Sequence, residues 1–326
     1  MRWLQTLLAL SWTGLPAMTM GAALDQESYV RVGASVLRIE APRVQGGFAL
    51  GSGVAVASDK VVTNCHVTHD ARAIHVLRGG LRFAASAQAS DIEHDICLLD
   101  VPGLDAAAVP LGSGATLSVG QPLSALGYTG GLGLQNSPGE VLALHRFEGG
   151  HVIQTSSFFT SGASGGGLFD ADGRLVGILT FRLRGGVGHY FSGPVEWVRG
   201  LLDGSSAVRF EPVGPAPAGP RRPYWQALSD ALPRFLRAAV LLREDRWSDL
   251  EVLAADWVRD SPEDGEPWYL RGAALEHLGR LPEARDALEC ALQVDPGRTP
   301  ALARLASMEQ EPGPSPLRVP SDPVCR

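Results

Sequence analysis

Apolar residues alternate with polar residues or glycine over much of the first two thirds of the chain. The clearest runs are residues 35–39, 48–57, 61–63 and 175–181. Alternation with a period of two is typical of strands that bury one face. Further strands are expected at residues 73–77, 96–99, 123–126, 151–155 and 168–169. Short strands joined by glycine-rich turns predict an all-β sandwich or barrel.

The pattern changes after a proline-rich stretch. Proline recurs through residues 212–223 at a density that neither a sheet nor a helix accommodates, so we expect an extended linker there. Beyond it, Ala, Leu, Arg and Glu follow helical spacing. The sequence therefore predicts a β domain over residues 24–211, a helical domain over residues 224–312 and a tail at residues 313–326.

The helical part has an internal period. Its small and apolar residues fall at the spacing of a tetratricopeptide repeat, a helix pair of about 34 residues; they are Trp268, Gly272, Ala284, Leu288, Ala291 and Pro296. The unit at residues 265–298 matches more of these positions than the unit at residues 231–264. Residues 299–308 predict a following or capping helix. A helical hairpin without repeat character is the alternative interpretation.

Composition places the chain among ordinary globular proteins. Of its 326 residues, 45% are hydrophobic and 19% are charged, which excludes a disordered chain and allows about two domains. The formal net charge is −7, and no basic stripe occurs. Nucleic acid is therefore not expected as a partner.

The first 23 residues have the features of an export signal. A positively charged start is followed by an apolar core at residues 4–15 and by small residues at 21–23. An uncleaved membrane anchor is the alternative, because residues 3–23 carry no charge. Pro16 and the small residues favour cleavage. We expect an exported protein, periplasmic or extracellular, with no further membrane span.

A serine lies in the most glycine-rich turn of the chain. Ser164 is flanked by Gly162, Ala163 and Gly165. Such a turn presents a hydroxyl and backbone N–H groups to one point, as acyl transfer requires, although a Gly-Ser-Gly run alone is commonly only a flexible loop. A histidine in Thr-Asn-Cys-His-Val and an aspartate in Asp-Ile-Cys-Leu-Leu precede it in the chain.

At these motifs the chain resembles the trypsin-like (chymotrypsin-fold) serine proteases, most closely the bacterial Deg/HtrA-type members. The ordered motifs lie within residues 36–194. The resemblance implies a chymotrypsin-like double β-barrel. It also implies that Ser164 is the nucleophile, His66 the general base and Asp95 the group that orients His66. The backbone N–H groups of Gly162 and Ser164 would form the oxyanion hole. Neither a cofactor nor a metal site is expected.

A different hydrolase fold also has a matching serine motif. Gly-x-Ser-x-Gly is the nucleophile elbow of α/β-hydrolases, which need a helix after the serine and an acid and a histidine downstream. Here glycines and a β-hairpin follow Ser164, while His66 and Asp95 precede it. The order of the three residues favours the chymotrypsin-like fold.

Three departures from the family pattern limit what the resemblance implies. Ala163 stands where digestive trypsin-like enzymes carry an aspartate that pairs with a new N-terminus, so we expect that activation switch to be absent. Gly167 stands where the family usually has proline. No PDZ-like module follows the protease part, so assembly into a Deg-type cage is not expected.

The resemblance also suggests a primary specificity pocket. Phe158 and Phe159 would line or underlie it, Thr180 and Phe181 would form one wall, and His189 would lie near the last pocket strand. A surface histidine is the alternative for His189. Without an acidic residue at the base, cleavage after Arg or Lys is not expected, and a small or medium apolar side chain is favoured.

The cysteines fall near the candidate catalytic residues. Cys65 adjoins the candidate base, and Cys97 lies two residues after the candidate acid. If base and acid form a hydrogen bond, these cysteines lie close enough for a disulfide; two buried thiols are the alternative. Cys290 and Cys325 would similarly tie the tail to the last repeat. No cluster with metal-ligand spacing occurs.

These observations leave three hypotheses. The main one is an exported serine endopeptidase that cuts polypeptides and uses its helical repeats to bind a partner or substrate. The second is a latent or vestigial protease acting as a peptide-binding scaffold, and the third an esterase. The complete set of three motif residues favours the first. The helical part would offer a concave binding surface, or pack on the protease, or form a dimer.

Overall fold

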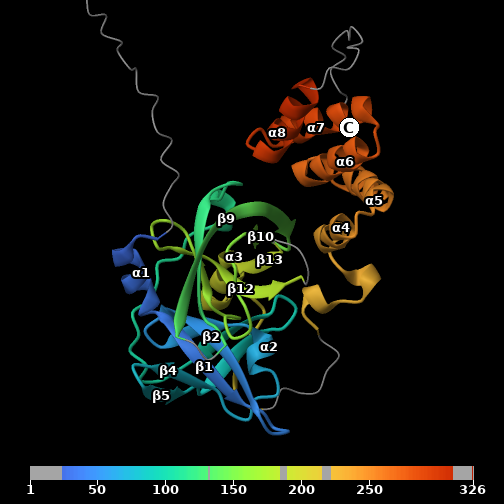
Figure 1. Cartoon of the computed structure of the whole chain (residues 1–326). Helices are drawn as coiled ribbons and strands as arrows, with labels where there is room; N and C mark the ends of the chain where they lie inside the picture. The colour runs from blue at the N-terminus through green and yellow to red at the C-terminus, as the bar shows by residue number, and fades with distance from the viewer. Residues whose placement is uncertain (1–23, 131–132, 184–188, 215–221, 311–324, 326) are drawn as a thin grey trace, which may run out of the picture.

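The computed structural model describes residues 24–130, 133–183, 189–214, 222–310 and 325. The described chain forms two β layers followed by a set of helices (Figure 1). The predicted export signal at residues 1–23 lies outside the described residues, as do most of the predicted linker and tail. None of the helices that the structure describes has the length and apolarity needed to cross a membrane.

The N-terminal β layer is an eight-stranded antiparallel sheet in the order β14-β6-β7-β3-β2-β1-β4-β5. Its strands are β1 (Val36–Pro42), β2 (Phe48–Ala57), β3 (Lys60–Thr63), β4 (His75–Arg78), β5 (Leu81–Ala84), β6 (Ala87–Asp91), β7 (Ile96–Asp100) and β14 (Phe210–Pro212). The helix α1 (Gln26–Gly33) precedes the sheet, and the one-turn helix α2 (Cys65–Thr68) follows β3. One core cluster gathers on this sheet around Ile39, Val61 and Leu99.

The second β layer is a closed barrel in the order β10-β13-β12-β11-β8-β9. Its strands are β8 (Pro122–Tyr128), β9 (Leu134–Phe147), β10 (Gly150–Thr155), β11 (Gly167–Phe169), β12 (Leu175–Arg182) and β13 (Tyr190–Pro194). The 3₁₀ turn η1 (Gly114–Thr116) precedes β8, and the helix α3 (Val195–Leu202) follows β13. All three residues of β11 are buried, and only the last residue of β12 is exposed. Strands buried on both faces explain why these segments are nearly continuous apolar runs.

The predicted double barrel needs a correction. Only the second layer closes, while the N-terminal sheet ends at β14 and β5 as a half-barrel. The edge at β6 is occupied by β14, with Phe210 opposite Ala89. The chain therefore uses that edge for a segment beyond the barrel, and β6 has no pairing left for closure.

Most of the predicted strands are confirmed, and the structure adds others. The hairpins β2–β3 and β11–β12 lie where the alternation predicts them. The longest strand, β9, was not predicted, because Pro138 and Gly139 interrupt it and its first half is largely solvent-exposed. The helices α1 and α3 were also missed.

The C-terminal part is helical, as predicted. The helices are α4 (Arg234–Arg243), α5 (Trp247–Asp260), α6 (Gly265–His277), α7 (Leu281–Val294) and α8 (Thr299–Gln310), preceded by the 3₁₀ turns η2 (Tyr224–Gln226) and η3 (Ser229–Ala231). Two helix pairs and a further helix fall at the predicted units. Their tetratricopeptide character remains a prediction from the sequence.

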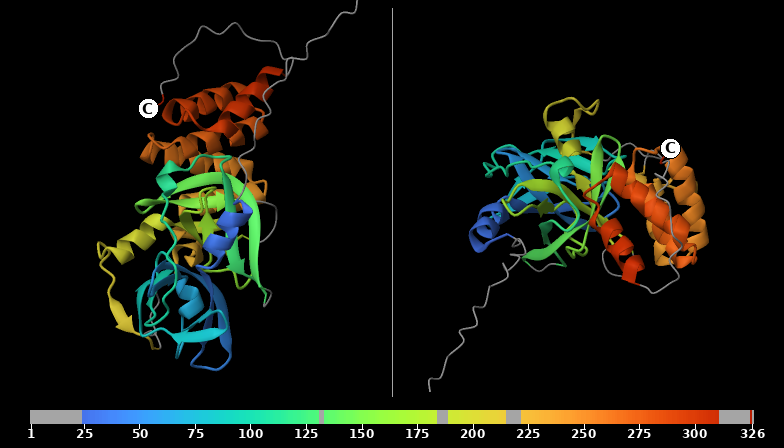
Figure 2. Two further views of the ribbon diagram at one scale, coloured as in Figure 1. Left: turned by 90° about the vertical axis from the view of Figure 1, so that its left-hand side faces the viewer. Right: turned by 90° about the horizontal axis from the view of Figure 1, so that it is seen from above.

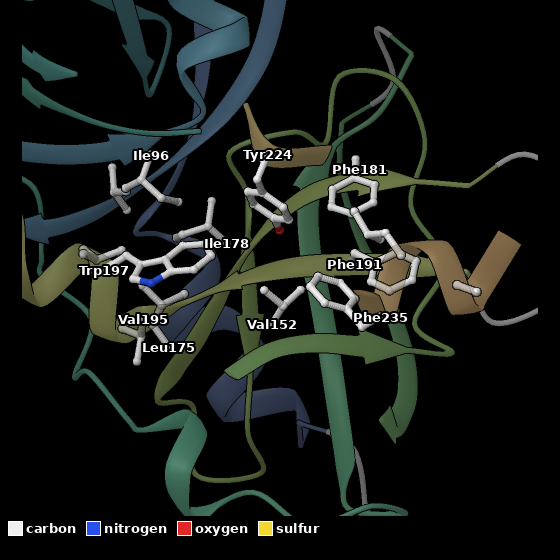
Figure 3. Packing of buried hydrophobic residues seen from close by; sticks show 14 of the residues in the cluster. Ile96, Val152, Leu175, Ile178, Phe181, Phe191, Val195, Trp197, Tyr224 and Phe235 are labelled. Atoms are coloured by element: carbon white, nitrogen blue, oxygen red, sulfur yellow. The ribbon is translucent and has the colours of Figure 1, made fainter. Parts of the chain in front are cut away.

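The core of the barrel continues into the helical part. One buried cluster contains Val152 and Phe191 of the barrel together with Tyr224 of η2 and Phe235 of α4 (Figure 3). Figure 2 shows the helices beside the barrel, away from the N-terminal sheet. The ring of Phe235 stacks on His145 of β9, with centroids 4.5 Å apart. The helices therefore pack on the barrel, which is one of the roles expected for them.

Candidate active site

The three candidate catalytic residues come from turns of both β layers. His66 lies on α2 directly after β3, and Asp95 lies in the turn before β7. Strands β3 and β7 are paired, with Thr63 opposite Cys97, so the segments that follow one strand and precede the other lie side by side. The third residue, Ser164, lies in the turn before β11 of the barrel.

His66 and Asp95 form two hydrogen bonds. The His66 backbone N–H donates to Oδ1 of Asp95 at 2.8 Å, and His66 Nδ1 lies 2.6 Å from Oδ2. The carboxyl group is buried, with 1% of the residue exposed. In the tautomer that donates to this carboxylate, Nδ1 carries the hydrogen and Nε2 is free to accept a proton.

The backbone around Asp95 is fixed by further contacts. Its φ of 60° lies in the left-handed region, which Asp adopts more readily than most residues. The side-chain amide of Asn64 and the N–H of Cys65 donate to the Asp95 carbonyl at 2.8 and 3.4 Å. Thus Asn64 and Cys65, the two residues before His66, help to place its partner.

The turn that carries Ser164 is held by β2. The N–H of Ser52 donates to the Ser164 carbonyl at 2.8 Å, and the Ser52 hydroxyl donates to the Gly162 carbonyl at 2.8 Å. The same hydroxyl accepts from the N–H of Tyr128 at 2.8 Å. Ser52 is fully buried and links both β layers to the turn. The sequence offered one signal for it, its place between two glycines.

Two glycines give this turn its shape. Gly162 and Gly165 have φ values of 99° and 85°, which side chains with a Cβ rarely adopt. A Cβ on Gly165 would lie 2.2 Å from the Ser52 carbonyl oxygen. In the described part of the chain, the N–H groups of Gly162 and Ser164 donate to no acceptor, and the Ser164 hydroxyl forms no hydrogen bond with His66.

Both predicted cysteine pairs are at disulfide distance. The Cα atoms of Cys65 and Cys97 are 4.9 Å apart, and those of Cys290 and Cys325 are 5.6 Å apart. The first pair joins α2 to β7, the two elements next to His66 and Asp95. Both separations lie within the usual range for a disulfide.

The residues predicted for the specificity pocket are less open than expected. Phe158 is 53% exposed, but Phe159 is buried against Tyr190, with ring centroids 5.2 Å apart. The Thr180 hydroxyl donates to the Ile178 carbonyl at 2.7 Å, inside the barrel. Thr180 is therefore buried, and its role as a pocket wall remains a prediction.

Phe181 is also covered. Its ring stacks on Phe191 on one side and on Trp225 on the other, with centroids 4.9 and 5.1 Å apart. Trp225 belongs to η2, beyond the linker, and nothing in the sequence predicts its contact with the barrel. His189 is half-buried, and burial together with the charge of Arg243 lowers its pKa.

A surface hollow of about 340 Å³ lies next to the Ser164 turn. Its lining consists of short polar residues and one aromatic ring: Thr129, Gly130, Gln135, Asn136, Ser137, Phe158 and Thr160. The N–H of Gly130 donates to the Ser161 carbonyl at 3.0 Å, which joins the hollow to the turn. Phe158 is the single residue that this hollow shares with the predicted pocket.

Trp225 contacts both Asp95 and His66, and the sequence did not predict these contacts. Its indole N–H donates to Oδ2 of Asp95 at 3.2 Å, across 130 residues of chain. Its ring meets the His66 ring edge-on, with centroids 5.7 Å apart. A single tryptophan after a proline-rich stretch carries no motif, so no signal in the sequence links it to Asp95.

A second histidine joins the two β layers beside the site. His94 Nδ1 lies 2.7 Å from Oδ2 of Asp91, and its Nε2 lies 2.8 Å from Oε2 of Glu148. Burial alone would lower the pKa of His94, but the hydrogen bonds and charges of Asp91 and Glu148 together raise it. The His94 ring packs on Trp197, with centroids 4.2 Å apart.

The residues that the structure describes contain no group of three or more His, Cys, Asp or Glu side chains able to hold a metal ion. The arrangement at His66 can move a proton, because a buried carboxylate holds Nδ1 and the His66 side chain remains 30% exposed.

Comparison with known proteins agrees with this geometry. Residues 51–178 match the family described as trypsin-like peptidase domain. The periplasmic serine endoprotease DegP of Escherichia coli K12 is 36% identical over 167 residues, which cover 47% of this chain and 35% of DegP. The chain thus spans about a third of the length of this curated relative.

Solved structures give the same fold. The structure of the HtrA-type protease AlgWS227A with tripeptide is 28% identical, with a TM-score of 0.50 over 54% of this chain and 61% of that chain. The Rv3671c protease from M. tuberculosis in its active form has a TM-score of 0.52 at 21% identity, covering 64% of this chain and 98% of that one. Residues 51–178 are thus similar to trypsin-like peptidase domains, and the DegP relative is named a serine endoprotease.

Proposed function

We propose that the chain is a serine endopeptidase in which His66, Asp95 and Ser164 form the catalytic triad. The observation that carries the proposal is the buried Asp95 carboxylate, which holds both the backbone N–H and the Nδ1 of His66. The similarity to serine endoproteases over the trypsin-like peptidase domain supports the same assignment.

The proposed reaction begins with a proton transfer. Nε2 of His66 takes the proton of the Ser164 hydroxyl as its oxygen attacks the carbonyl carbon of the peptide bond. The imidazolium, stabilised by Asp95, then gives that proton to the leaving amine, and an acyl-enzyme remains. Water, deprotonated by His66, attacks the ester and releases the acid and Ser164.

The developing negative charge needs preorganised donors. The N–H groups of Gly162 and Ser164 belong to the turn that Ser52 anchors through the Gly162 and Ser164 carbonyls. Fixed donors stabilise an oxyanion because they need no reorganisation as the charge appears. We assign the oxyanion hole to these two groups.

The proposed substrate is a polypeptide cut after a small or medium apolar residue. Phe158 is exposed and meets Tyr190 edge-on, with centroids 5.5 Å apart, so an aromatic surface stands beside the Ser164 turn. We also propose export from the cytoplasm, which rests on the apolar N-terminal segment and on the periplasmic DegP relative.

The helical part has two proposed roles. Its packing on the barrel, through Phe235 on His145, supports a role in holding the peptidase domain. Binding of a peptide or protein partner by its remaining surface rests on the repeat-like spacing in the sequence alone.

Digestion of casein tests the proposed function. The wild-type chain is expected to cut casein, and Ser164→Ala to lose about 10⁴-fold or more in rate. Ser161→Ala, in the same turn, is the matched control and is expected to retain activity. Mass spectrometry of the products gives the residue before each cut.

Equal digestion by wild type and Ser164→Ala would contradict the proposal. A folded wild-type chain that cuts nothing would favour the latent scaffold. Cuts concentrated after Arg, Lys, Asp or Glu would reject the proposed apolar preference while leaving the nucleophile in place.

A further inference from the structure

Trp225 is the residue of the helical part nearest to the proposed chemistry. Its Nε1–H donates to Oδ2 of Asp95 at 3.2 Å, the oxygen that also contacts His66 Nδ1. Oδ1 receives the His66 backbone N–H. The carboxylate thus has three donors, two from His66 and one from a segment outside the matched peptidase domain.

The position of Trp225 is fixed from several sides. Its ring lies nearly parallel to Phe181, at an interplanar angle of 9°. The preceding residue, Tyr224, is buried, and its N–H donates to the carbonyl of Glu93 at 2.9 Å. Glu93 lies two residues before Asp95, so η2 is bound to the same turn that it contacts through the indole.

The helical part anchors this segment from its other end. Phe235 of α4 belongs to the same buried cluster as Tyr224, and their centroids are 6.4 Å apart (Figure 3). Farther along, His145 Nδ1 lies 2.6 Å from Oε1 of Glu266 at the start of α6, with both side chains buried. The helices and η2 therefore form one packed unit with the barrel.

Resting on the proposed function, we infer that Trp225 is a positioning residue of the triad, supplied by the helical part. A buried carboxylate that accepts a third hydrogen bond loses rotational freedom. The orientation of the His66 ring, which is hydrogen-bonded to this carboxylate, is then fixed as well. The edge contact between Trp225 and His66 limits the movement of that ring further.

The indole also reduces the negative charge of Asp95 that acts on His66. The positive end of its N–H dipole points at the carboxylate, and the carboxylate therefore stabilises the His66 imidazolium less. The other titratable side chain that interacts with Asp95 from this segment is Tyr224, whose pKa is raised by burial and then by the Asp95 charge. Tyr224 therefore stays neutral.

Trp225→Phe in the full chain tests the inference, because it keeps an aromatic ring for Phe181 and removes the N–H. With a peptide substrate, kcat is expected to fall about 10-fold while KM changes by less than about 2-fold. The acidic limb of the kcat/KM profile should move to higher pH. Trp225→His, which restores a ring N–H, is expected to recover part of the loss.

Trp268→Phe is the matched control. Its indole N–H donates to the Pro262 carbonyl at 2.9 Å. The substitution therefore removes an indole hydrogen bond of the same kind, but in the helical part and away from the triad. It is expected to leave kcat and the pH profile unchanged. An unchanged kcat and pH profile in Trp225→Phe would overturn the inference. A rise in KM alone would also overturn it, because Trp225 would then only shape the substrate cleft.

A spectroscopic readout separates this inference from the proposed function. The proton between His66 Nδ1 and Asp95 is expected to give a low-field ¹H NMR signal that shifts or broadens in Trp225→Phe and persists in Trp268→Phe. This signal does not depend on turnover. If the wild type shows no Ser164-dependent cleavage, the proposed function fails, and an unchanged signal then rejects the positioning role independently.

Discussion

The peptidase domain and the helical part contribute to the site in different ways. His66 and Asp95 are placed by backbone pairing of β3 with β7, and each lies in a motif that the sequence displays. Trp225 reaches Asp95 from a segment without a motif, through side-chain packing on Phe181. Residues held by a sheet are visible in the sequence, whereas a residue held by packing between domains is visible only in the structure.

The difference extends to how each part is stabilised. The described peptidase domain has two sheets with ordered registers and a cysteine pair between α2 and β7. The contacts of the helices with the barrel include one buried His–Glu pair and a set of aromatic contacts. We therefore expect single substitutions at this contact surface to weaken the attachment of the helices to the barrel.

Asp95→Asn should have the largest effect on the peptidase side of this comparison. Asparagine keeps the shape of the side chain but removes the negative charge and favours the wrong His66 tautomer. We expect kcat to fall about 10⁴-fold. The measurement is steady-state cleavage of a peptide substrate.

The control for Asp95→Asn is Asp100→Asn. Asp100 forms a partly exposed ion pair with Lys60, 2.9 Å away, so this change should alter kcat little. A similar kcat for wild type and Asp95→Asn would show that the buried carboxylate has no part in the reaction.

Glu266→Ala should have the largest effect on the helical side. It leaves the buried Nδ1 of His145 without its partner, and the loss of one member of a buried pair typically costs about 3–5 kcal/mol. The free energy of unfolding in urea measures this loss. Glu283→Ala, which breaks a solvent-exposed pair with Arg280, is expected to leave the free energy of unfolding almost unchanged. Equal losses in both variants would mean that Glu266 does not hold the helices on the barrel.

His94→Gln should give the smallest effect, and one that depends on pH. The pKa of His94 is raised in the folded state, after the lowering by burial is offset by Asp91 and Glu148. Its stabilisation is therefore full below the unfolded pKa of about 6.5 and is lost as pH rises through the folded pKa. The variant should lose about 1 kcal/mol or less near pH 5.5, and still less near pH 9.

Urea unfolding of wild type and His94→Gln at both pH values checks this sign. A larger destabilisation at the higher pH would show that His94 is held neutral in the folded state. His69→Gln, at an exposed pair with Asp70, is the control and should show little dependence on pH.

The sequence predicted most of the fold where side chains obey one periodicity. Strands such as β2, β7 and β12 alternate or are fully apolar, and the helices α4 to α8 follow a regular spacing. The strand β9 was not predicted, because Pro138 and Gly139 interrupt the alternation of apolar and polar residues in it. Closure of the first barrel was taken from the resemblance, and β14 occupies the edge at β6.

The candidate site was predictable only in part, for the same physical reason. His66, Asp95 and Ser164 lie in motifs because their turns need particular neighbours. Ser52 and Trp225 contact these turns from distant segments, and many sequences could supply such a contact. The burial of Phe181 could not be predicted, because it depends on the packing of Trp225, which lies beyond the linker.

Labelling with a fluorophosphonate probe, followed by peptide mapping, tests the nucleophile most directly. We expect an adduct on Ser164 of the wild-type chain, with labelling lost in Ser164→Ala and in His66→Ala and retained in Ser161→Ala. Equal labelling of wild type and Ser164→Ala would contradict the assignment of Ser164 as the nucleophile.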